Sequence, residues 1–277
     1  MTLAITGPTS GIGIETVKAL APKFEQIFLL VRNKEKAENL LPELTSPDQY
    51  EKFQIIYCDL TDLESVSEAA KSLLSKTTKL DLLINNAGGI VKNHKMTKDG
   101  VEYSFSLNHL GHFLLTQKLL PLLEASGKAR IINVSSEAHT MAKPNFEDLN
   151  DVKNYSSWRT YANVKLFNIL FTKSLAERYA EKNIVAFALH PGVVRTQFGS
   201  EMTGILSLAW KLASPFKISP KKGARTSVFL ALNPEVISDT GSYFKKSKIH
   251  SSSKDSNSQD LRNKLWEISE KLVQPWL

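Results

Sequence analysis

Short apolar runs alternate with segments of helical periodicity along the first 190 residues of the chain. This alternation is typical of a parallel sheet covered by helices on both faces, because each crossover between parallel strands needs a helix. The runs are almost continuously apolar, which indicates strands that are buried on both sides. The predicted strands are residues 3–6, 26–31, 53–57, 80–85, 130–135 and 184–190.

The segments between these strands predict helices at residues 11–21, 34–42, 62–76, 101–124 and 159–182, with Thr61 and Asp62 as caps of the third helix. After residue 196 the rhythm changes. An apolar stretch is followed by a predicted helix at 221–232, a short GSYF strand and a final amphipathic helix, LRNKLWEISEKLV. We predict one doubly wound α/β domain over residues 1–277, with a mostly parallel sheet of about seven strands.

The composition narrows the class of protein. A chain of 277 residues with 42% apolar residues can bury one large core. The net charge of +7 is scattered, so we expect no nucleic-acid partner. The one basic cluster, Lys245, Lys246 and Lys248, runs into the serine-rich HSSSKDSNSQD, for which we predict a solvated loop.

The sole cysteine, Cys58, rules out an intramolecular disulfide and favours a reducing compartment. The N-terminal residues do not resemble a signal peptide, and the apolar stretches are too short to span a bilayer. We therefore expect a soluble, cytoplasmic protein with no transmembrane segment.

The glycine-rich TGPTSGIG, residues 6–13, follows the first strand and opens the first helix. Gly7 permits a tight turn, Gly11 lets the backbone approach a pyrophosphate, and Gly13 allows the helix to pack closely on the sheet. We assign cofactor contacts in this loop to Gly7, Thr9, Ser10, Gly11, Ile12 and Gly13. A glycine-rich turn without a ligand is the alternative.

The second strand ends in Val31, Arg32 and Asn33, where an NAD site would place a carboxylate for the ribose hydroxyls. The planar donors of Arg32 suit a 2′-phosphate instead. The sequence therefore favours NADP(H), with NAD(H) as the other candidate and an exposed loop arginine as the structural alternative.

Tyr161 and Lys165 lie one helical turn apart, which places their Cβ atoms about 5–6 Å from each other. A tyrosine with a pKa of about 10 needs a shift of ~3 units to act as a base near neutral pH. One ammonium at ~5 Å supplies roughly 3 kcal/mol of the ~4 kcal/mol required. We expect Lys165 to lower the pKa of Tyr161, although such pairs also occur by chance on many helices.

Ser135 stands at the carboxyl end of the fifth strand, the edge at which open α/β sheets bind ligands. Because neighbouring side chains of a strand point to opposite faces, only one of Ser135 and Ser136 should reach the substrate, and our hypothesis assigns Ser135. The turn from Asn85 to Gly88 ends the fourth strand at the same edge, where its small residues let a cofactor lie against the backbone.

These motifs resemble, in order, those of the short-chain dehydrogenase/reductase family: TGxxxGIG, NNAG (85–88), the strand-end serine, YxxxK (161–165) and HPGVVRT (190–196). The resemblance covers residues 2 to about 235. PGVVRT and the closing KLWEISEKLV are further similar to the retinol-dehydrogenase-like branch. The resemblance implies a Rossmann-type fold and hydride transfer between NADP(H) and an alcohol or carbonyl substrate.

Carried over residue by residue, the resemblance implies that Tyr161 is the acid/base, that Lys165 also holds the nicotinamide ribose, and that Ser135 orients the substrate. Asn108 would support a proton relay through water. Further cofactor contacts are implied for Asp59, Leu60, Asn86, Ala87, Gly88, Pro191, Gly192, Val194 and Thr196. Departures from the family pattern are Val164, where serine is frequent, and Pro8 in the phosphate loop.

Other candidate residues receive structural interpretations. His109 and His112 lie three apart on a predicted helix but lack a third ligand, so we expect no metal. We expect His139 in a surface loop, Cys58 as a buried apolar residue, and His190 as a partner of backbone groups.

The apolar stretch 204–216 is either a substrate lid, within a segment 197–220, or a core helix; residues 245–277 form a C-terminal loop and helix. A lid of this kind would favour a lipophilic substrate.

Two functions remain in competition. The first is an oxidoreductase, a carbonyl reductase or alcohol dehydrogenase acting on a small molecule. The second is a non-catalytic NADP(H)-binding sensor or scaffold. The presence of both Tyr161 and Lys165 favours the enzyme. Relatives often dimerise through the outer face of the helix that carries them, so a homodimer is a further prediction.

Overall fold

An eight-stranded sheet forms the centre of the computed structural model, which describes residues 1–150, 155–194 and 218–277. Its strand order is β3-β2-β1-β4-β5-β6-β7-β8. The strands are β1 (Thr2–Thr6), β2 (Gln26–Val31), β3 (Phe53–Tyr57), β4 (Leu82–Asn85), β5 (Arg130–Val134), β6 (Val185–His190), β7 (Tyr243–Lys245) and β8 (Lys248–Ile249).

The helices connect these strands. They are α1 (Gly11–Leu20), α2 (Lys34–Glu38), α3 (Leu41–Leu44), α4 (Leu63–Leu74), α5 (Tyr103–Phe105), α6 (Gly111–Ser126), α7 (Ser157–Arg178), α9 (Pro220–Leu232) and α10 (Gln259–Val273). A π-helical turn, Ser106–Leu110, joins α5 to α6. Short 3₁₀ turns lie at Ala21–Lys23, Pro47–Lys52, Glu137–Met141, Ala180–Lys182, Pro234–Asp239, Asp255–Asn257 and Gln274–Trp276.

All strand pairs are parallel except β7 with β8. β1 lies between β2 and β4, so the chain order reverses beside β1, and ligands of open α/β sheets bind at such a point. The doubly wound, mostly parallel fold is confirmed. The sheet has eight strands rather than about seven because the chain turns back through Lys246 and Ser247, which have positive φ angles of 53° and 58°.

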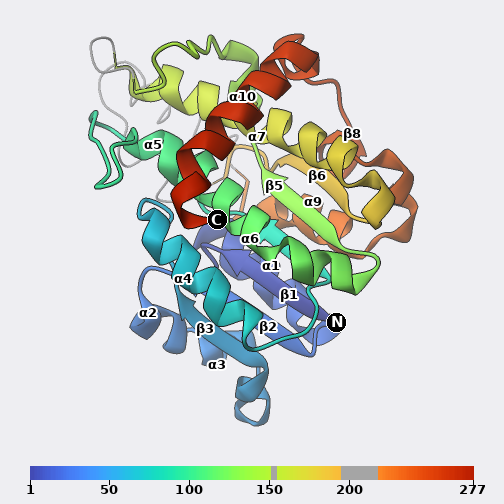
Figure 1. Ribbon diagram of the computed structural model, residues 1–277. Coiled ribbons are helices and arrows are strands. Elements are labelled where there is room, and N and C mark those ends of the chain that lie inside the picture. Colours follow the sequence, from blue (N-terminus) through green and yellow to red (C-terminus); the bar gives the residue numbers. More distant parts are fainter. Residues whose placement is uncertain (151–154, 195–217) are drawn as a thin grey trace.

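The sheet is covered on both faces, as predicted (Figure 1). Ala4 and Phe28 face the core that contains residues of α4, α6, α7 and α10. Their neighbours Leu3 and Leu29 face the opposite core with residues of α1 and α9. This alternation follows from the two-residue period of a strand, and it explains why the strands are apolar throughout.

Some predicted helix boundaries were wrong. The helix expected at 34–42 is interrupted between α2 and α3, where Pro42 occupies the first turn of α3 and cannot extend α2. Asp62 caps α4 as predicted, since its carboxylate accepts a hydrogen bond from the Ser65 amide at 3.1 Å. Among the described helices, none combines the length and the apolar character that crossing a bilayer would require.

The C-terminal helix α10 packs on α7 and crosses in front of it in Figure 1. Its Trp266 ring lies 5.0 Å from that of Phe113, and the Arg178 guanidinium lies 4.2 Å from the Trp266 ring centroid. The serine-rich segment before α10 is solvated only in part, which corrects the prediction. Ser256 is fully buried, and the Ser253 carbonyl and the Ser252 hydroxyl satisfy its hydroxyl group.

We expect Trp266→Ala to lower the free energy of unfolding by ~3–5 kcal/mol, because a large aromatic side chain is lost from a packed site. Urea unfolding measures the change. Leu277→Ala, at a side chain that is 56% exposed, is the control and should change stability by less than ~0.5 kcal/mol. Equal effects of the two substitutions would contradict the docking of α10 as a part of the core.

Candidate active site

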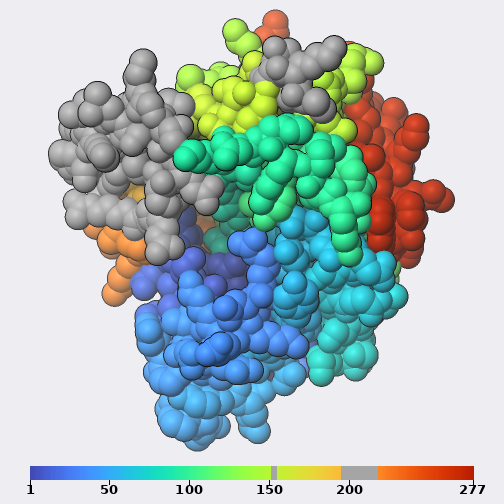
Figure 2. Space-filling model, turned by 90° about the vertical axis from the view of Figure 1, so that its left-hand side faces the viewer, coloured from blue at the N-terminus to red at the C-terminus, as the bar shows by residue number. Residues whose placement is uncertain are grey.

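A cavity of about 1240 Å³ opens at the carboxyl ends of β1, β2 and β4. Figure 2 shows the hollow on this face, between the blue N-terminal segments and the teal segment that follows β4. Three basic side chains line the cavity, Arg32, Lys36 and Lys95, and none of the described lining residues is acidic. The cavity therefore suits an anionic ligand.

The predicted phosphate loop borders this cavity, and each of its assigned residues lines it. Gly7 and Gly11 have positive φ angles of 63° and 54°, which L side chains rarely adopt. A Cβ atom on Gly13 would lie 2.1 Å from the Gly7 carbonyl oxygen, so only glycine fits there. With α1 beginning at Gly11, backbone N–H groups face the cavity, and the loop fits a pyrophosphate.

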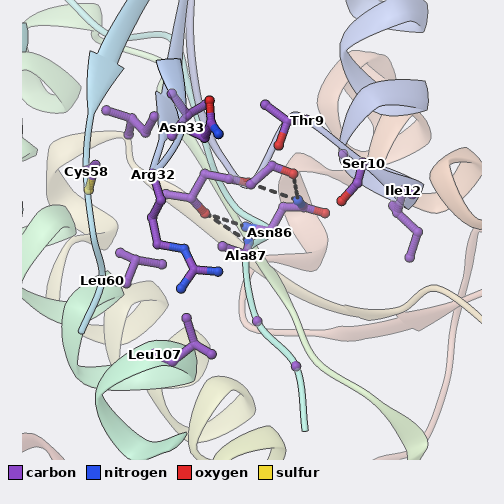
Figure 3. A pocket seen from close by; sticks show the side chains of 18 of the residues that line it. Thr9, Ser10, Ile12, Arg32, Asn33, Cys58, Leu60, Asn86, Ala87 and Leu107 are labelled. Carbon is purple, nitrogen blue, oxygen red and sulfur yellow. Dashed lines mark hydrogen bonds between the residues drawn. The ribbon is translucent and has the colours of Figure 1, made fainter. Parts of the chain in front are cut away.

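Asn86 holds the phosphate loop in place. Its side-chain amide donates hydrogen bonds to the carbonyls of Thr6, at 2.9 Å, and Gly7, at 3.0 Å (Figure 3). In return, the Thr6 hydroxyl oxygen accepts hydrogen bonds from the backbone amides of Asn86 and Ala87, both at 3.0 Å. Asn86, Ala87 and Gly88, for which the family resemblance implied cofactor contacts, all line the cavity.

The far end of the cavity is basic. Arg32 extends from the end of β2 and donates a long hydrogen bond of 3.4 Å to the Tyr103 hydroxyl. The Asn33 side chain caps α2 by accepting from the Lys36 amide at 2.8 Å, and this cap directs the first turn of α2 past the cavity. Lys36 was missed in the sequence, although it lies one turn after a capping asparagine. Lys95, whose ammonium lies 3.4 Å from the Tyr103 ring centroid, gave no sequence signal.

Asp59 does not line the cavity, whereas its neighbours Cys58 and Leu60 do. Its carboxylate accepts hydrogen bonds from the amide and the hydroxyl of Thr61, at 2.9 and 2.7 Å. In the structure, the Asp59 side chain therefore shapes the turn that precedes α4. Cys58 is buried, as predicted, and burial raises the pKa of its thiol to about 12.

Tyr161 and Lys165 lie in α7, with the Lys165 ammonium 5.5 Å from the Tyr161 ring centroid and bonded to the Val134 carbonyl at 3.0 Å. Burial lowers the pKa of Lys165 to about 7. Burial also raises the pKa of Tyr161, against a smaller lowering by a hydrogen bond with the Ser136 side chain. In the protein without cofactor, burial therefore outweighs the expected lowering of the Tyr161 pKa by Lys165, because both groups are removed from water.

The structure corrects the choice of serine. The Ser135 hydroxyl is buried and donates to the Lys165 carbonyl at 2.6 Å. Ser136, and not Ser135, is hydrogen bonded to the Tyr161 side chain. Both serines contact α7, Ser135 at the Lys165 carbonyl and Ser136 at the Tyr161 side chain. Strand alternation in the sequence could therefore not show which of them lies beside Tyr161.

Asn108 lies in the π-helical turn, a rare conformation that is frequent at functional sites. Its side-chain amide donates to the Gly89 carbonyl at 3.1 Å, and its oxygen accepts from the Gly89 amide at 2.9 Å. A Cβ atom on Gly88 would lie 2.5 Å from the Asn108 oxygen and 3.2 Å from the Lys165 ammonium. Gly88 lines the cavity and lies against Asn108 and Lys165, whereas Asn108, Lys165, Tyr161, Ser135 and Ser136 are not among the lining residues.

The segment after β6 is described in part. Val194 is buried, and Gly223 of α9 lies against both Val194 and Ile12 of the phosphate loop. A Cβ atom on Gly223 would lie 2.8 Å from the Val194 side chain and 3.2 Å from that of Ile12. Pro191, Gly192 and Val194 do not line the cavity. Thr196 and the proposed lid up to residue 217 lie outside the described residues.

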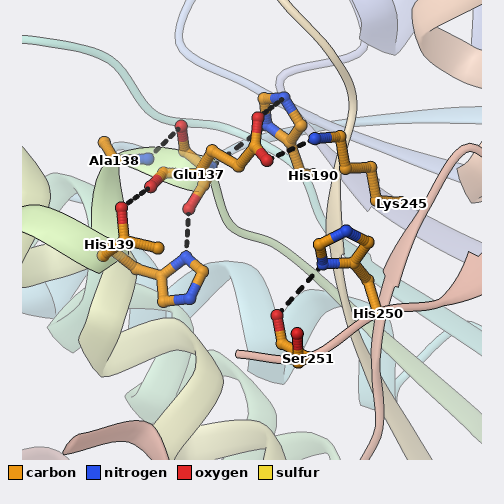
Figure 4. A network of polar contacts seen from close by, with 9 residues as sticks. Glu137, Ala138, His139, His190, Lys245, His250 and Ser251 are labelled. Carbon is orange, nitrogen blue, oxygen red and sulfur yellow. Dashed lines mark hydrogen bonds and ion pairs between the residues drawn. The ribbon is translucent and has the colours of Figure 1, made fainter. Parts of the chain in front are cut away.

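The turn that follows Ser136 is tied to the C-terminal part of the chain (Figure 4). The Glu137 carboxylate pairs with Lys245, and this contact holds its pKa below the usual range. The Glu137 amide donates to His190 Nδ1 at 3.2 Å, which confirms the interpretation of His190. His139 is buried between the Ser136 carbonyl, at 2.7 Å, and the Ser253 amide, at 3.1 Å, so the prediction of a surface histidine was wrong.

His109 and His112 are buried on α6 and the turn before it, with separate partners. His109 Nε2 bonds to the Ser269 hydroxyl at 2.9 Å, and His112 Nε2 bonds to the Thr6 hydroxyl at 2.9 Å. Within residues 1–150, 155–194 and 218–277, no group of three His, Cys, Asp or Glu side chains could hold a metal ion.

We expect Lys165→Met to stabilise the nucleotide-free protein at pH 7. The pKa of Lys165 is about 7 when folded and 10.5 ordinarily, so between these values the unfolded chain binds more protons and stability rises with pH. The advantage of Lys165→Met should therefore shrink between pH 7 and pH 10. The Val134 carbonyl keeps a donor in the variant, Asn168 at 3.1 Å.

Urea unfolding at both pH values measures this effect, with the exposed Lys271→Met as control. A variant that is less stable than the wild-type protein at pH 7, or an advantage that grows toward pH 10, would show that burial of the Lys165 ammonium does not cost folding free energy.

Comparisons with known proteins agree with this geometry. The short chain dehydrogenase family model matches residues 1–204. Retinol dehydrogenase 12 of Mus musculus is 37% identical over 271 residues, which cover 98% of this chain and 85% of the relative.

Two solved structures are similar along most of their length. One is an uncharacterised protein from Mycobacterium paratuberculosis, with a TM-score of 0.78, 30% identity and coverage of 99% of this chain and 93% of that one. The other is NADPH-bound carbonyl reductase from chicken fatty liver, with a TM-score of 0.68, 25% identity and coverage of 91% and 98%. This chain belongs to the short-chain dehydrogenase/reductase family, in its retinol-dehydrogenase-like branch, and is an oxidoreductase of that family.

Proposed function

We propose that this oxidoreductase transfers hydride between NADP(H) and a lipophilic alcohol or carbonyl compound. The observation that carries the cofactor preference is the cavity wall, where Arg32 and Lys36 follow β2 and no described lining residue is acidic. A 2′-phosphate would gain charge-assisted hydrogen bonds there, whereas an NAD site needs a carboxylate for the ribose. The NADPH-bound carbonyl reductase with a similar fold adds support.

In the proposed mechanism, the bound nicotinamide supplies or accepts the hydride. Tyr161 donates its phenolic proton to the carbonyl oxygen during reduction and removes the hydroxyl proton during oxidation. The Ser136 hydroxyl, which bonds to the Tyr161 side chain, donates a hydrogen bond to the same substrate oxygen. Lys165 and Asn108 meet at Gly88, which lines the cavity, so we place the reaction at this end of it.

Lys165 contributes charge. Its buried ammonium stabilises the phenolate form of Tyr161, and an effective dielectric near 20 makes such an interaction at ~5 Å worth roughly 3 kcal/mol. Because burial alone lowers the pKa of Lys165, the negative charge of bound phosphates and hydrogen bonds to ribose hydroxyl oxygens would favour its protonated form. Cofactor binding would thereby prepare the acid/base pair.

The preference for a lipophilic substrate rests on apolar side chains near the catalytic turn. Trp158 lies one turn before Tyr161 with ring centroids 6.0 Å apart, and Met141 and Val193 are exposed beyond the ends of β5 and β6. A relative named retinol dehydrogenase 12 acts, by its name, on a lipophilic alcohol. We therefore expect retinaldehyde or a long-chain aldehyde to be reduced with a higher kcat/KM than glyceraldehyde. Equal values for all three would remove this part of the proposal.

We expect Arg32→Ala to raise the KM for NADPH roughly tenfold to a hundredfold, because charge-assisted hydrogen bonds to the 2′-phosphate are lost. The KM for NADH should stay nearly unchanged. Steady-state kinetics with both nucleotides measure the difference. Lys34→Ala, two residues later in the chain and outside the cavity lining, is the matched control. Wild-type protein that uses NADH and NADPH with equal efficiency would refute the cofactor preference.

We expect Tyr161→Phe to reduce kcat by about 10²–10⁴-fold, the usual contribution of general acid–base catalysis. Ser136→Ala should reduce kcat by about 10²-fold, because a hydrogen-bond donor to the reacting oxygen is lost. Ser135→Ala should lower stability by ~1 kcal/mol, because the Lys165 carbonyl loses a donor, and change kcat much less. A larger kinetic effect at Ser135 than at Ser136 would restore the original assignment.

The non-catalytic sensor or scaffold is tested by the same assays. Tight NADPH binding together with no turnover of any aldehyde, ketone, quinone or steroid, followed at 340 nm, would favour it. The intact pair of Tyr161 and Lys165 supports the enzyme.

A further inference from the structure

His112 occupies an unusual position between the two halves of the cofactor site. It lies in the first turn of α6, is 2% exposed, and both ring nitrogens have partners. Nε2 lies 2.9 Å from the Thr6 hydroxyl, and Nδ1 lies 3.3 Å from the Asn108 carbonyl. One imidazole therefore connects the start of the phosphate loop to the π-helical turn.

The partners determine where the protons are. The Thr6 oxygen accepts hydrogen bonds from two backbone amides, so its own proton is directed at His112 Nε2. Nδ1 must then carry the ring proton and donate it to the Asn108 carbonyl. A protonated ring would direct an N–H at Nε2 toward the Thr6 oxygen, which has no lone pair left to accept it because the two backbone amides already use both. Burial agrees with a neutral ring, because it lowers the pKa of His112 to about 3, with the positive charge of Lys165 acting in the same direction.

Each partner holds one wall of the site. The carbonyls of Thr6 and Gly7 fix the Asn86 side chain, and with it the phosphate loop. The Asn108 side chain is hydrogen bonded to the Gly89 backbone through both its amide nitrogen and its oxygen. Without His112, the Thr6 proton and the Asn108 carbonyl would each lose this bond inside the protein, where an unsatisfied polar group is costly.

We propose that His112 is a positioning residue which, as a neutral Nδ1–H tautomer, links the phosphate loop to Asn108, so that the seating of the dinucleotide and the placement of Asn108 depend on each other. The inference rests on dinucleotide binding, which is part of the proposed function, but not on the preference for NADP(H).

A double-mutant cycle between His112 and Thr6 tests the link. His112→Asn keeps a donor near the Nδ1 position and removes the acceptor for Thr6, and Thr6→Val removes the hydroxyl. His112→Asn should raise the Kd of the dinucleotide about fivefold, the effect of one buried hydrogen bond. Thr6→Val should raise the Kd by more, because the Asn86 and Ala87 amides lose their acceptor as well. The double variant should be no weaker than the weaker single variant, because both changes break the same bond. Additive effects, or an unchanged Kd in His112→Asn, would overturn the inference.

The titrations use whichever of NADPH and NADH the wild-type protein binds more tightly, followed by nucleotide fluorescence. His109→Asn is the matched control, because His109 is equally buried three residues away and bonds to Ser269 of α10 instead. It should lower the thermal unfolding temperature without raising the Kd. Wild-type protein that binds neither nucleotide would overturn the proposed function and this inference together, whereas tight wild-type binding with an equal Kd in His112→Asn overturns this inference alone.

A second measurement does not require a folded variant. In ¹⁵N-histidine-labelled wild-type protein, the His112 resonances should report a neutral ring with the proton on Nδ1 from pH 5 to pH 8. A charged ring, or a proton on Nε2, would contradict the proposed hydrogen bonds.

A further variant tests the acceptor. His112→Gln, which returns an acceptor near the Nε2 position, should recover part of the lost affinity, and no recovery relative to His112→Asn would count against the link.

Discussion

The burial of the Lys165 ammonium is the constraint on which the active site depends. A charged group removed from water is costly unless it is hydrogen bonded, and the described structure gives this one the Val134 carbonyl as acceptor. The carbonyl lies at the end of β5, so the strand and α7 must pack in one register. The Ser135 hydroxyl contributes to the same register by bonding to the Lys165 carbonyl. Tyr161 and Ser136 are thereby brought together.

The cofactor cavity follows from a second constraint, the close approach of glycine backbone to neighbouring groups. Gly13 lies against Gly7, and Gly88 lies against Asn108 and Lys165, with no space for a side chain at either place. These contacts bring the carboxyl ends of β1 and β4 together at the point where the strand order reverses. The result is one cavity that runs from basic side chains at one end to Gly88, beside Lys165, at the other.

The C-terminal part of the chain takes part in this arrangement. β7 brings Lys245 to the carboxylate that follows Ser136, and the Ser253 amide bonds to His139 in the same turn. Residues more than 100 positions later in the sequence therefore hold the catalytic turn. Neither contact has a local sequence pattern, since isolated serine and lysine residues are ordinary in solvated loops.

The sequence by itself determined the layered fold and the ordered motifs around Gly7, Asn86 and Tyr161, because two-residue and 3.6-residue periods and glycine requirements are local properties. The tertiary structure alone brought Ser136, and not Ser135, to the Tyr161 side chain, placed Lys36 at the cavity and buried His139. Each of these depends on how far a strand is rotated against a helix, or on which distant segment covers a turn. Such distances between elements are set by the packing of the whole core, and no short stretch of sequence encodes them.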